Sequence, residues 1–228
     1  MNIFSIFTIC NHSYKDAIDF SIPSWLKLQS VDKIYIYTDF EYEYNDERVI
    51  IINSIDKTDD WLKIVGLKAM ILKEFITEYN PLNFVFIDID CYITADISDV
   101  FDYDFDIAAT RMHSKKSANS GVWFCKNTDA MKQFSEEWIK LQTEYRNRGK
   151  GTVKHRQSYS QLSFSEILHK QYKSKNGCLR VHPIDGQIYN SENDNINEWY
   201  KNVKKYNPKI LHFKGRRWRD KKIVKNVL

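Results

Sequence analysis

The chain has 228 residues, of which 43% are hydrophobic and 14% aromatic, with a net charge of +4. This length allows one sizeable hydrophobic core and is short for two independent domains, so we predict a single domain over residues 1–228. The four cysteines include no C-x-x-C pair, which argues against a zinc knuckle or a disulfide framework. No secretory signal and no run of about 20 apolar residues is present, so we expect a cytoplasmic protein.

Positive charge gathers at the end of the chain. Residues 201–228 contain eleven Lys or Arg and one acid, Asp220, a net charge of +10 that leaves −6 for residues 1–200. Such a segment can bind phosphate groups, an anionic membrane surface or nucleic acid, and composition alone does not choose among them. No recognition-helix or other nucleic-acid motif accompanies the basic segment, so nucleic acid is the least favoured partner.

The first eighty residues alternate between strand-like and helix-like segments. β-branched and aromatic residues predict strands over residues 3–9, 33–39 and 49–53. A helix is predicted to begin near Tyr14 and to break at Pro23, and the clearest helical periodicity covers residues 60–79. This alternation indicates an α/β fold.

The rest of the chain continues the pattern. The predicted strands cover residues 106–110, 122–125 and 209–215, the last of which breaks at Gly215, and residues 180–190 are expected to form a strand, a turn and a second strand. The predicted helices begin at Asp129, after a Thr128 cap, and at Ser158.

Residues 83–90 (N-F-V-F-I-D-I-D) have the profile of a buried parallel strand that ends in two carboxylates. Because residues i and i+2 of a strand point to the same face, Asp88 and Asp90 are expected to project together at the sheet edge where α/β folds bind ligands. Two neighbouring carboxylates repel each other, and a hard divalent cation relieves that repulsion. The alternative is a strand that simply runs into an acidic turn.

Lys68 lies in the middle of the apolar stripe of the helix predicted over residues 60–79. An unpaired buried ammonium group is costly. Lys68 must therefore extend to solvent or have an anionic partner, either a ligand phosphate or a carboxylate of the chain.

Three motifs occur in an order that resembles a known family. F-I-D-I-D at residues 86–90, N-S-G-V-W-F at 119–124 and H-F-K-G at 212–215 are similar to motifs of the GT-A glycosyltransferases, most closely those of family 8, which contains glycogenin and bacterial galactosyltransferases. The resemblance spans most of the chain. It implies a GT-A (Rossmann-like) α/β domain with a mixed, mostly parallel sheet flanked by helices. It also implies transfer of a hexose from a nucleotide-diphosphate sugar, with UDP-hexose as the expected donor, to a glycan acceptor with retention of configuration.

The resemblance also implies roles for particular residues. Asp88, Asp90 and His212 would bind Mn²⁺ or Mg²⁺, and Asp90 and Gln161 would be catalytic. The implied substrate-binding residues are Thr38, Asp39, Lys68, Asp88, Asn119, Ser120, Gly121, Lys214, Gly215, Arg216 and Arg217.

Two positions depart from the family pattern. Ser160 stands before Gln161 where family members carry an Asp, and no Lys-Pro pair precedes Trp218. The first departure concerns contacts to the donor, and the second leaves the family pattern H-x-x-G-x-x-K-P-W incomplete.

Two other functions compete with the transferase. D-I-D-C-Y-I-T superficially resembles the nucleophile motif of haloacid-dehalogenase phosphatases, D-x-D-x-T/V, but Tyr92 occupies the place of the Thr or Val. A non-enzymatic protein could instead bind an anionic surface or nucleic acid through residues 201–228, whose aromatic side chains could stack on bases. Activity without any divalent ion would count against the transferase.

Overall fold

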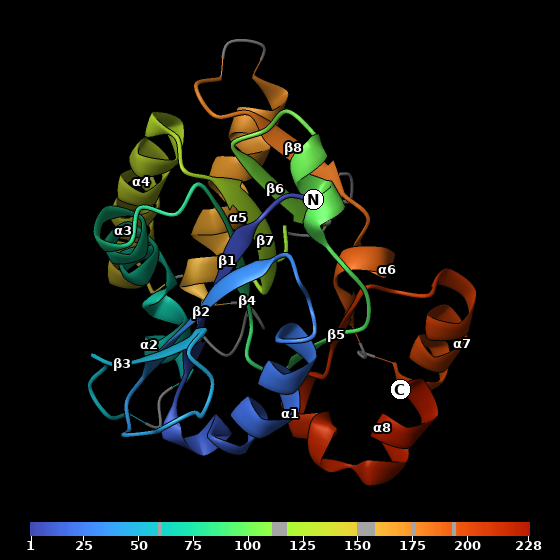
Figure 1. Ribbon diagram of the computed structural model, residues 1–228. Helices are drawn as coiled ribbons and strands as arrows, with labels where there is room; N and C mark the ends of the chain where they lie inside the picture. Colours follow the sequence, from blue (N-terminus) through green and yellow to red (C-terminus); the bar gives the residue numbers. More distant parts are fainter. Residues whose placement is uncertain (59–60, 111–117, 150–157, 175–176, 193–194) are drawn as a thin grey trace.

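The computed structural model describes residues 1–58, 61–110, 118–149, 158–174, 177–192 and 195–228 (Figure 1). Its strands are β1 (Phe4–Cys10), β2 (Val31–Thr38), β3 (Val49–Asn53), β4 (Asn83–Ile87), β5 (Cys91–Ile93), β6 (Ile107–Thr110), β7 (Val122–Lys126), β8 (Val181–Ile184), β9 (Ser191–Glu192) and β10 (Ile210–His212). Its α-helices are α1 (Asp16–Trp25), α2 (Trp61–Gly66), α3 (Lys68–Glu78), α4 (Asp129–Asn147), α5 (Tyr159–Lys173), α6 (Gly186–Tyr189), α7 (Ile196–Tyr206) and α8 (Lys221–Val227).

Within these residues, seven strands form a main sheet in the order β3-β2-β1-β4-β7-β6-β8. Neighbouring strands are parallel except where β7 pairs antiparallel with β4 and β6. The predicted α/β class with a mixed, mostly parallel sheet is therefore confirmed. The winding direction reverses at β1, which has β2 on one side and β4 on the other. Open α/β sheets bind ligands at such a switch point, outside the carboxyl ends of the strands.

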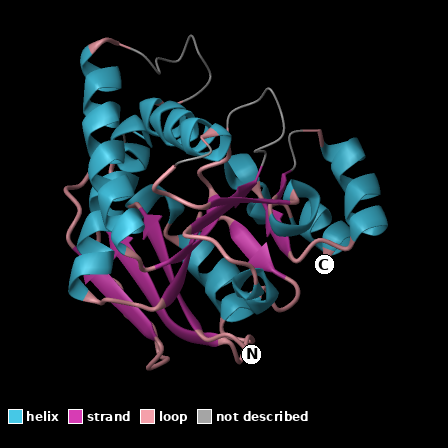
Figure 2. Cartoon of the chain, turned by 90° about the horizontal axis from the view of Figure 1, so that it is seen from above, coloured by secondary structure: helices cyan, strands magenta, loops and turns pink. Residues whose placement is uncertain are grey.

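Helices cover both faces of this sheet, as Figure 2 shows from above. On one face, side chains of β1 and β4 such as Phe7 and Phe86 pack in a buried cluster with α3, α4 and α5. On the other face, their neighbours Ile6 and Val85 pack with α1 and the C-terminal elements. Burial on both faces explains why these strands are almost continuously apolar. Within the described residues, no helix combines the length and the apolar character that crossing a membrane requires.

A second sheet of three short strands, in the order β5-β10-β9, lies beside the switch point. β10 runs antiparallel to β5 and parallel to β9, and this register places His212 opposite both Cys91 and Glu192. Helix α1 fixes β5 in place, because the Trp25 indole N–H donates to the Cys91 carbonyl at 3.1 Å. The small sheet thus places residues from three distant parts of the chain side by side on adjacent strands.

Two helix predictions need correction. The expected break at Pro23 is absent, because α1 continues to Trp25 and the Leu26 N–H still donates to the Ile22 carbonyl at 3.0 Å. The helix expected over residues 60–79 is divided into α2 and α3, and Asp60 lies outside the described residues. The division arises where the Leu67 N–H bonds to the Ile64 carbonyl, three residues back, which tightens the turn.

Two strand predictions also need correction. The second strand expected within residues 180–190 is the short helix α6, whose start is capped by the Asp185 side chain accepting from the Gln187 N–H at 2.8 Å. The final strand ends at His212, before Gly215. Gly215 and Arg216 both have left-handed backbone angles, with φ of 66° and 63°, which a continuing strand does not allow.

The strand expected to carry Asp88 and Asp90 ends before either of them. β4 stops at Ile87, and the two acids lie in the turn that joins β4 to β5. The Cys91 N–H closes this turn by donating to the Asp88 carbonyl at 3.1 Å. The two carboxylates are therefore brought together by a turn and not by strand periodicity.

Candidate active site

A cleft of about 370 Å³ opens at the switch point. Its walls come from the segments after β1 and β4, from α2 and α3, and from the C-terminal segment. The lining residues are Ile9, Asn11, Ser13, Tyr14, Ile64, Val65, Lys68, Asp88, Ile89, Asp90 and Arg216. The cleft therefore lies where the topology of the sheet predicts a ligand site.

Asp88, Asp90 and His212 converge at this cleft. His212 Nε2 lies 3.1 Å from Oδ1 of Asp90 and 3.8 Å from Oδ2 of Asp88. The side chains of His212 and Asp90 are 5% and 12% exposed. The structure therefore brings the three residues predicted as metal ligands into one cluster, although β10 and the β4–β5 turn are far apart in the chain.

Asn190 fixes the orientation of the His212 ring. Its amide Oδ1 lies 2.9 Å from His212 Nδ1, and its Nδ2 donates to the Thr110 hydroxyl at 3.4 Å. Because a carbonyl oxygen can only accept, Nδ1 carries a proton, so Nε2, which faces the two carboxylates, is the ring nitrogen that can offer a lone pair to a cation. Two carboxylates and an imidazole nitrogen form a donor set that suits a divalent cation. A hydrogen bond from the other ring nitrogen, here from Nδ1 to Asn190, is typical of metal-binding histidines.

Burial and the carboxylates of this cluster raise the pKa values of Tyr14 and Cys91. Burial raises the pKa of the Tyr14 hydroxyl, and the Asp90 carboxylate raises it further, while Arg216 acts in the opposite direction. Burial, followed by the carboxylates of Asp90 and Asp88, also raises the pKa of the Cys91 thiol well above its usual range. The carboxylates at the end of β4 thus act on both side chains, although burial is the larger cause of each raised pKa.

For Lys68 the sequence left open whether its side chain extends to solvent, binds a ligand phosphate or pairs with a carboxylate of the chain. Its ammonium group lies 2.7 Å from Asp88 Oδ1 and donates to the Ser120 carbonyl at 2.9 Å, and it stands 4.6 Å from the centre of the Phe86 ring. Lys68 is buried and also lines the cleft. The structure therefore gives Lys68 a carboxylate partner, Asp88. Because Lys68 also lines the cleft, its ammonium group faces the space where a ligand phosphate would bind.

The loop before β7 approaches the acid cluster closely. The Gly121 N–H donates to Asn119 Oδ1 at 2.6 Å, and its carbonyl accepts from the Asp88 N–H at 2.8 Å. The Asn119 Nδ2 donates to the buried carboxylate of Glu192, which also pairs with Lys214 at 2.9 Å. Asn119 and Gly121 therefore lie beside the cluster, and Glu192 links their loop to the C-terminal segment.

The C-terminal segment closes one side of the cleft. Arg216 lines the cleft, and its guanidinium lies 4.9 Å from the centre of the Tyr14 ring. Arg219 holds the segment in place through two hydrogen bonds of 2.6 Å to the Asp16 carboxylate at the start of α1. The left-handed backbone at Gly215 and Arg216 turns the chain from β10 toward α1. Arg217 lies in the same segment but does not line the cleft.

Thr38, Asp39 and Gln161 lie outside the lining of the cleft. The Thr38 hydroxyl donates to the Phe40 carbonyl at 2.7 Å, and the buried Asp39 carboxylate lies 2.8 Å from Nδ1 of His12 and accepts from its backbone N–H at 2.6 Å. Gln161 Nε2 donates to the Ala118 carbonyl at 3.3 Å. Asp39 supports the loop after β1, Thr38 supports the segment after β2, and Gln161 contacts Ala118, the residue before Asn119.

Sequence reasoning did not find Asn190, Glu192, Cys91 or Tyr14 as members of this site. Asn190 ends the segment 180–190, which was expected to form a strand, a turn and a second strand, and Glu192 lies just beyond it; no pattern connects either residue to His212. Cys91 did carry a signal, since it directly follows Asp90. Tyr14 was assigned only to the start of a helix.

A larger cavity of about 710 Å³ lies elsewhere, between the segment after β3 and helices α2, α3 and α4. The residues that line it include Asp56, Glu74 and Gln142 but no histidine. We assign the chemistry to the smaller cleft, because within the described residues the only group of three or more potential metal ligands, Asp90, Cys91 and His212, lies there.

The architecture and this acidic cluster define an α/β protein with the GT-A type of fold. The chain belongs to the nucleotide-diphospho-sugar transferase family, whose family model matches residues 19–225. This membership disfavours the phosphatase and the non-enzymatic alternatives. No match was found among curated proteins.

Solved structures that share this fold include two glycosyltransferases. The glycosyltransferase GlyE of Streptococcus pneumoniae TIGR4 has a TM-score of 0.59 and 17% identity over 95% of this chain and 55% of GlyE. The chain therefore spans about half the length of GlyE. A glycosyltransferase involved in the glycosylation of the major capsid of PBCV-1 has a TM-score of 0.58 and 13% identity over 97% of this chain and 99% of that protein. At these identities the likeness is one of fold.

Proposed function

We propose that residues 1–228 form one metal-dependent glycosyltransferase unit that moves a hexose from a UDP-sugar to a glycan acceptor. The observation that carries this proposal is the convergence of Asp88, Asp90 and His212 at the switch-point cleft of a nucleotide-diphospho-sugar transferase. The cluster supplies two carboxylates and an imidazole lone pair, a donor set that fits Mn²⁺ or Mg²⁺. The similarity of the motifs to family 8 supports the choice of UDP and hexose.

In this mechanism Asp88, Asp90 and His212 would hold the cation, which when bound supplies the positive charge that neutralises the diphosphate leaving group. Asn190 keeps the His212 ring in the tautomer that presents Nε2. Lys68 orients Asp88 through the 2.7 Å ion pair and adds positive charge beside the phosphates. These residues lower the barrier by electrostatic stabilisation that is in place before the sugar–phosphate bond breaks.

The remaining predicted residues fall into three groups around the cleft. Thr38 and Asp39 would support the part of the cleft that binds the nucleotide base. The Asp39 side chain holds His12 after β1, and the Thr38 side chain holds Phe40 after β2. The Asn119–Gly121 loop borders the donor sugar and is fixed by Glu192. Lys214, Gly215, Arg216 and Arg217 would approach the diphosphate, with Arg216 as the direct contact because it lines the cleft.

The basic segment 201–228 has a second possible partner. Lysines on α7 and α8 are exposed and are not part of the cleft: Lys201, Lys204, Lys205, Lys221, Lys222 and Lys225. A peripheral contact with an anionic membrane surface through these lysines is consistent with their charge and would place the acceptor near that surface.

We also propose that transfer retains the anomeric configuration. Two acids in the second half of the chain are candidates for the base that an inverting enzyme needs, but both have structural partners. The Glu166 carboxylate accepts from the Tyr145 hydroxyl, and Asp185 caps α6. Gln161 would stand near the reactive face of the sugar, behind the Asn119 loop. Proton NMR of the product from an α-linked donor tests this, and a β-glycoside would overturn it.

The donor is tested by thermal unfolding of the wild type with UDP, GDP or CMP, each with and without Mn²⁺. A ligand at 100 times its dissociation constant stabilises the fold by about 2.7 kcal/mol, so UDP with Mn²⁺ is expected to raise the melting temperature. Asp90→Ala should lose that gain. Stabilisation by GDP or CMP in place of UDP would contradict the donor assignment.

Gly121 provides a test of the metal cluster that leaves its ligands in place. A Cβ atom at this position would lie 2.6 Å from Asp88 Oδ2 and 2.9 Å from both Asn119 Oδ1 and His212 Cε1. Gly121→Ala should therefore displace two ligands and weaken Mn²⁺ binding by about 10- to 100-fold, the range seen when groups around metal ligands are altered. The binding is measured by calorimetric titration.

Gly186→Ala is the matched control for Gly121→Ala. Its added Cβ would meet only the Thr110 Cβ, at an ordinary 3.5 Å, so Mn²⁺ affinity should be unchanged. Equal Mn²⁺ affinity in Gly121→Ala and the wild type would show that the cation does not bind between Asp88 and His212.

A further inference from the structure

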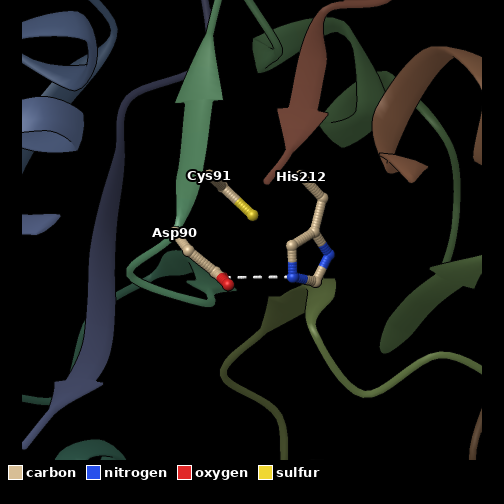
Figure 3. A group of neighbouring side chains, drawn as sticks. All are labelled: Asp90, Cys91 and His212. Carbon is tan, nitrogen blue, oxygen red and sulfur yellow. Dashed lines mark ion pairs between the residues drawn. The ribbon is translucent and has the colours of Figure 1, made fainter. Parts of the chain in front are cut away.

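Cys91 lies inside the acid–imidazole cluster, a position that the sequence motifs do not assign to a thiol. Its side chain is fully buried, and its β5 position is directly opposite His212 of β10. Directly opposite residues of an antiparallel pair project to the same face, so this register sets the sulfur beside the imidazole. One potential ligand atom from each of Asp90, Cys91 and His212 lies within 4.8 Å of the others, and Figure 3 shows the sulfur pointing into the space beside the contact between Asp90 and His212.

The other cysteines provide a contrast. The Cys10 thiol has backbone acceptors, the Asn11 and Tyr14 carbonyls, at 3.6 Å and 3.5 Å. Cys125 packs in the core on the opposite face of the main sheet, and Cys178 is exposed. Among the described residues, only Cys91 belongs to a group of acids and histidine with metal-ligand spacing.

We propose that Cys91 is a sulfur donor that makes this site bind thiophilic divalent cations, such as Zn²⁺, Co²⁺ or Cd²⁺, together with Asp90 and His212. The proposal rests on the same metal centre as the proposed function and adds a second class of cation to it. Thiolate ligands select such cations, whereas carboxylate and carbonyl oxygens suit Mg²⁺ and Mn²⁺. As the sulfur binds, the thiol releases its proton to solvent, and no oxidation state changes.

The two classes of cation use different donors around one position. Mn²⁺ or Mg²⁺ takes the oxygens of Asp88 and Asp90 with His212 and leaves Cys91 protonated. A thiophilic cation takes Cys91, Asp90 and His212, so that its binding competes with Mn²⁺. The site would therefore bind Cd²⁺ or Zn²⁺ more tightly than the oxygen donors alone allow.

The test is a titration of the 228-residue chain with Co²⁺, followed by near-ultraviolet absorption. Wild type should develop a sulfur-to-cobalt charge-transfer band, and Cys91→Ser should lose it. Cys178→Ser, which changes an exposed thiol, should keep the band. In equilibrium dialysis Cys91→Ser should weaken Cd²⁺ binding by about 10- to 100-fold and change Mn²⁺ binding by less than about threefold.

The outcomes separate this proposal from the proposed function. Absence of the band in the wild type, or its persistence in Cys91→Ser, overturns the role of Cys91 even if Mn²⁺ supports sugar transfer. A Cys91-dependent band in a protein that transfers no sugar supports the thiol ligand and leaves the transferase wrong. The wild-type spectrum alone can overturn the proposal, and a circular dichroism spectrum of Cys91→Ser that matches the wild type shows that a lost band does not reflect lost folding.

Discussion

Replacing Asp90 by asparagine is expected to lower divalent-cation-dependent sugar transfer by about 10²- to 10³-fold while leaving the protein folded. The loss of a single electrostatic group aimed at a developing charge has an effect of this size. Asp90 is the carboxylate nearest to His212 Nε2, at 3.1 Å, and its side chain is only 12% exposed. Asparagine keeps the shape of the side chain but removes the charge that holds the cation.

The measurement is the transfer rate as a function of Mn²⁺ concentration, with circular dichroism as the check of folding. Asp129→Asn is the matched control, since that carboxylate is 91% exposed on α4 and pairs with Lys132 at the surface. It should transfer sugar at the wild-type rate. A rate for Asp90→Asn within about tenfold of the wild type, a barrier change of ~1.4 kcal/mol, would contradict Asp90 as the principal ligand.

Lys68→Met is expected to lower the free energy of unfolding by about 2–3 kcal/mol and to weaken donor binding. Removing one partner of a buried ion pair costs about 3–5 kcal/mol, because the other charge is left uncompensated. Lys68 is 6% exposed, but its partner Asp88 is 29% exposed, so solvent reduces that cost. The substitution also removes the donor to the Ser120 carbonyl, which holds the loop next to the cluster.

Urea unfolding measures this effect, and Lys73→Met on the same helix is its control. Lys73 pairs with Glu136 at 3.0 Å, but both side chains are at least half exposed, so its loss should cost no more than about 1 kcal/mol. If Lys68→Met unfolds at the same urea concentration as Lys73→Met, the Lys68–Asp88 pair contributes nothing beyond a surface contact.

Local patterns were sufficient for the strands of the main sheet. β1, β2, β4 and β7 are runs of β-branched and aromatic residues, and burial on both faces of a parallel sheet requires that composition. Two of the errors occurred where a single hydrogen bond decided the outcome. The Asp185 cap turned an expected strand into α6, and the Leu67–Ile64 bond divided an expected helix.

The sequence predicted only some residues of the candidate site. Asp88 and Asp90 were found because they directly follow a recognisable strand, and His212 because its motif resembles a family pattern. Cys91 and Asn190 were missed because their importance depends on strand register. No local pattern reveals that Cys91 pairs with His212, or that Asn190 accepts from the same ring.

The sequence by itself determined the class of fold, the two acids after β4 and the basic character of residues 201–228, because each of these follows from neighbouring residues and their periodicity. Only the tertiary structure decided which groups meet. The small sheet sets Cys91, His212 and Glu192 in one row, and the Arg219–Asp16 pair brings Arg216 to the cleft. These contacts join segments distant in the chain, and their geometry depends on sheet register and packing, which no local pattern specifies.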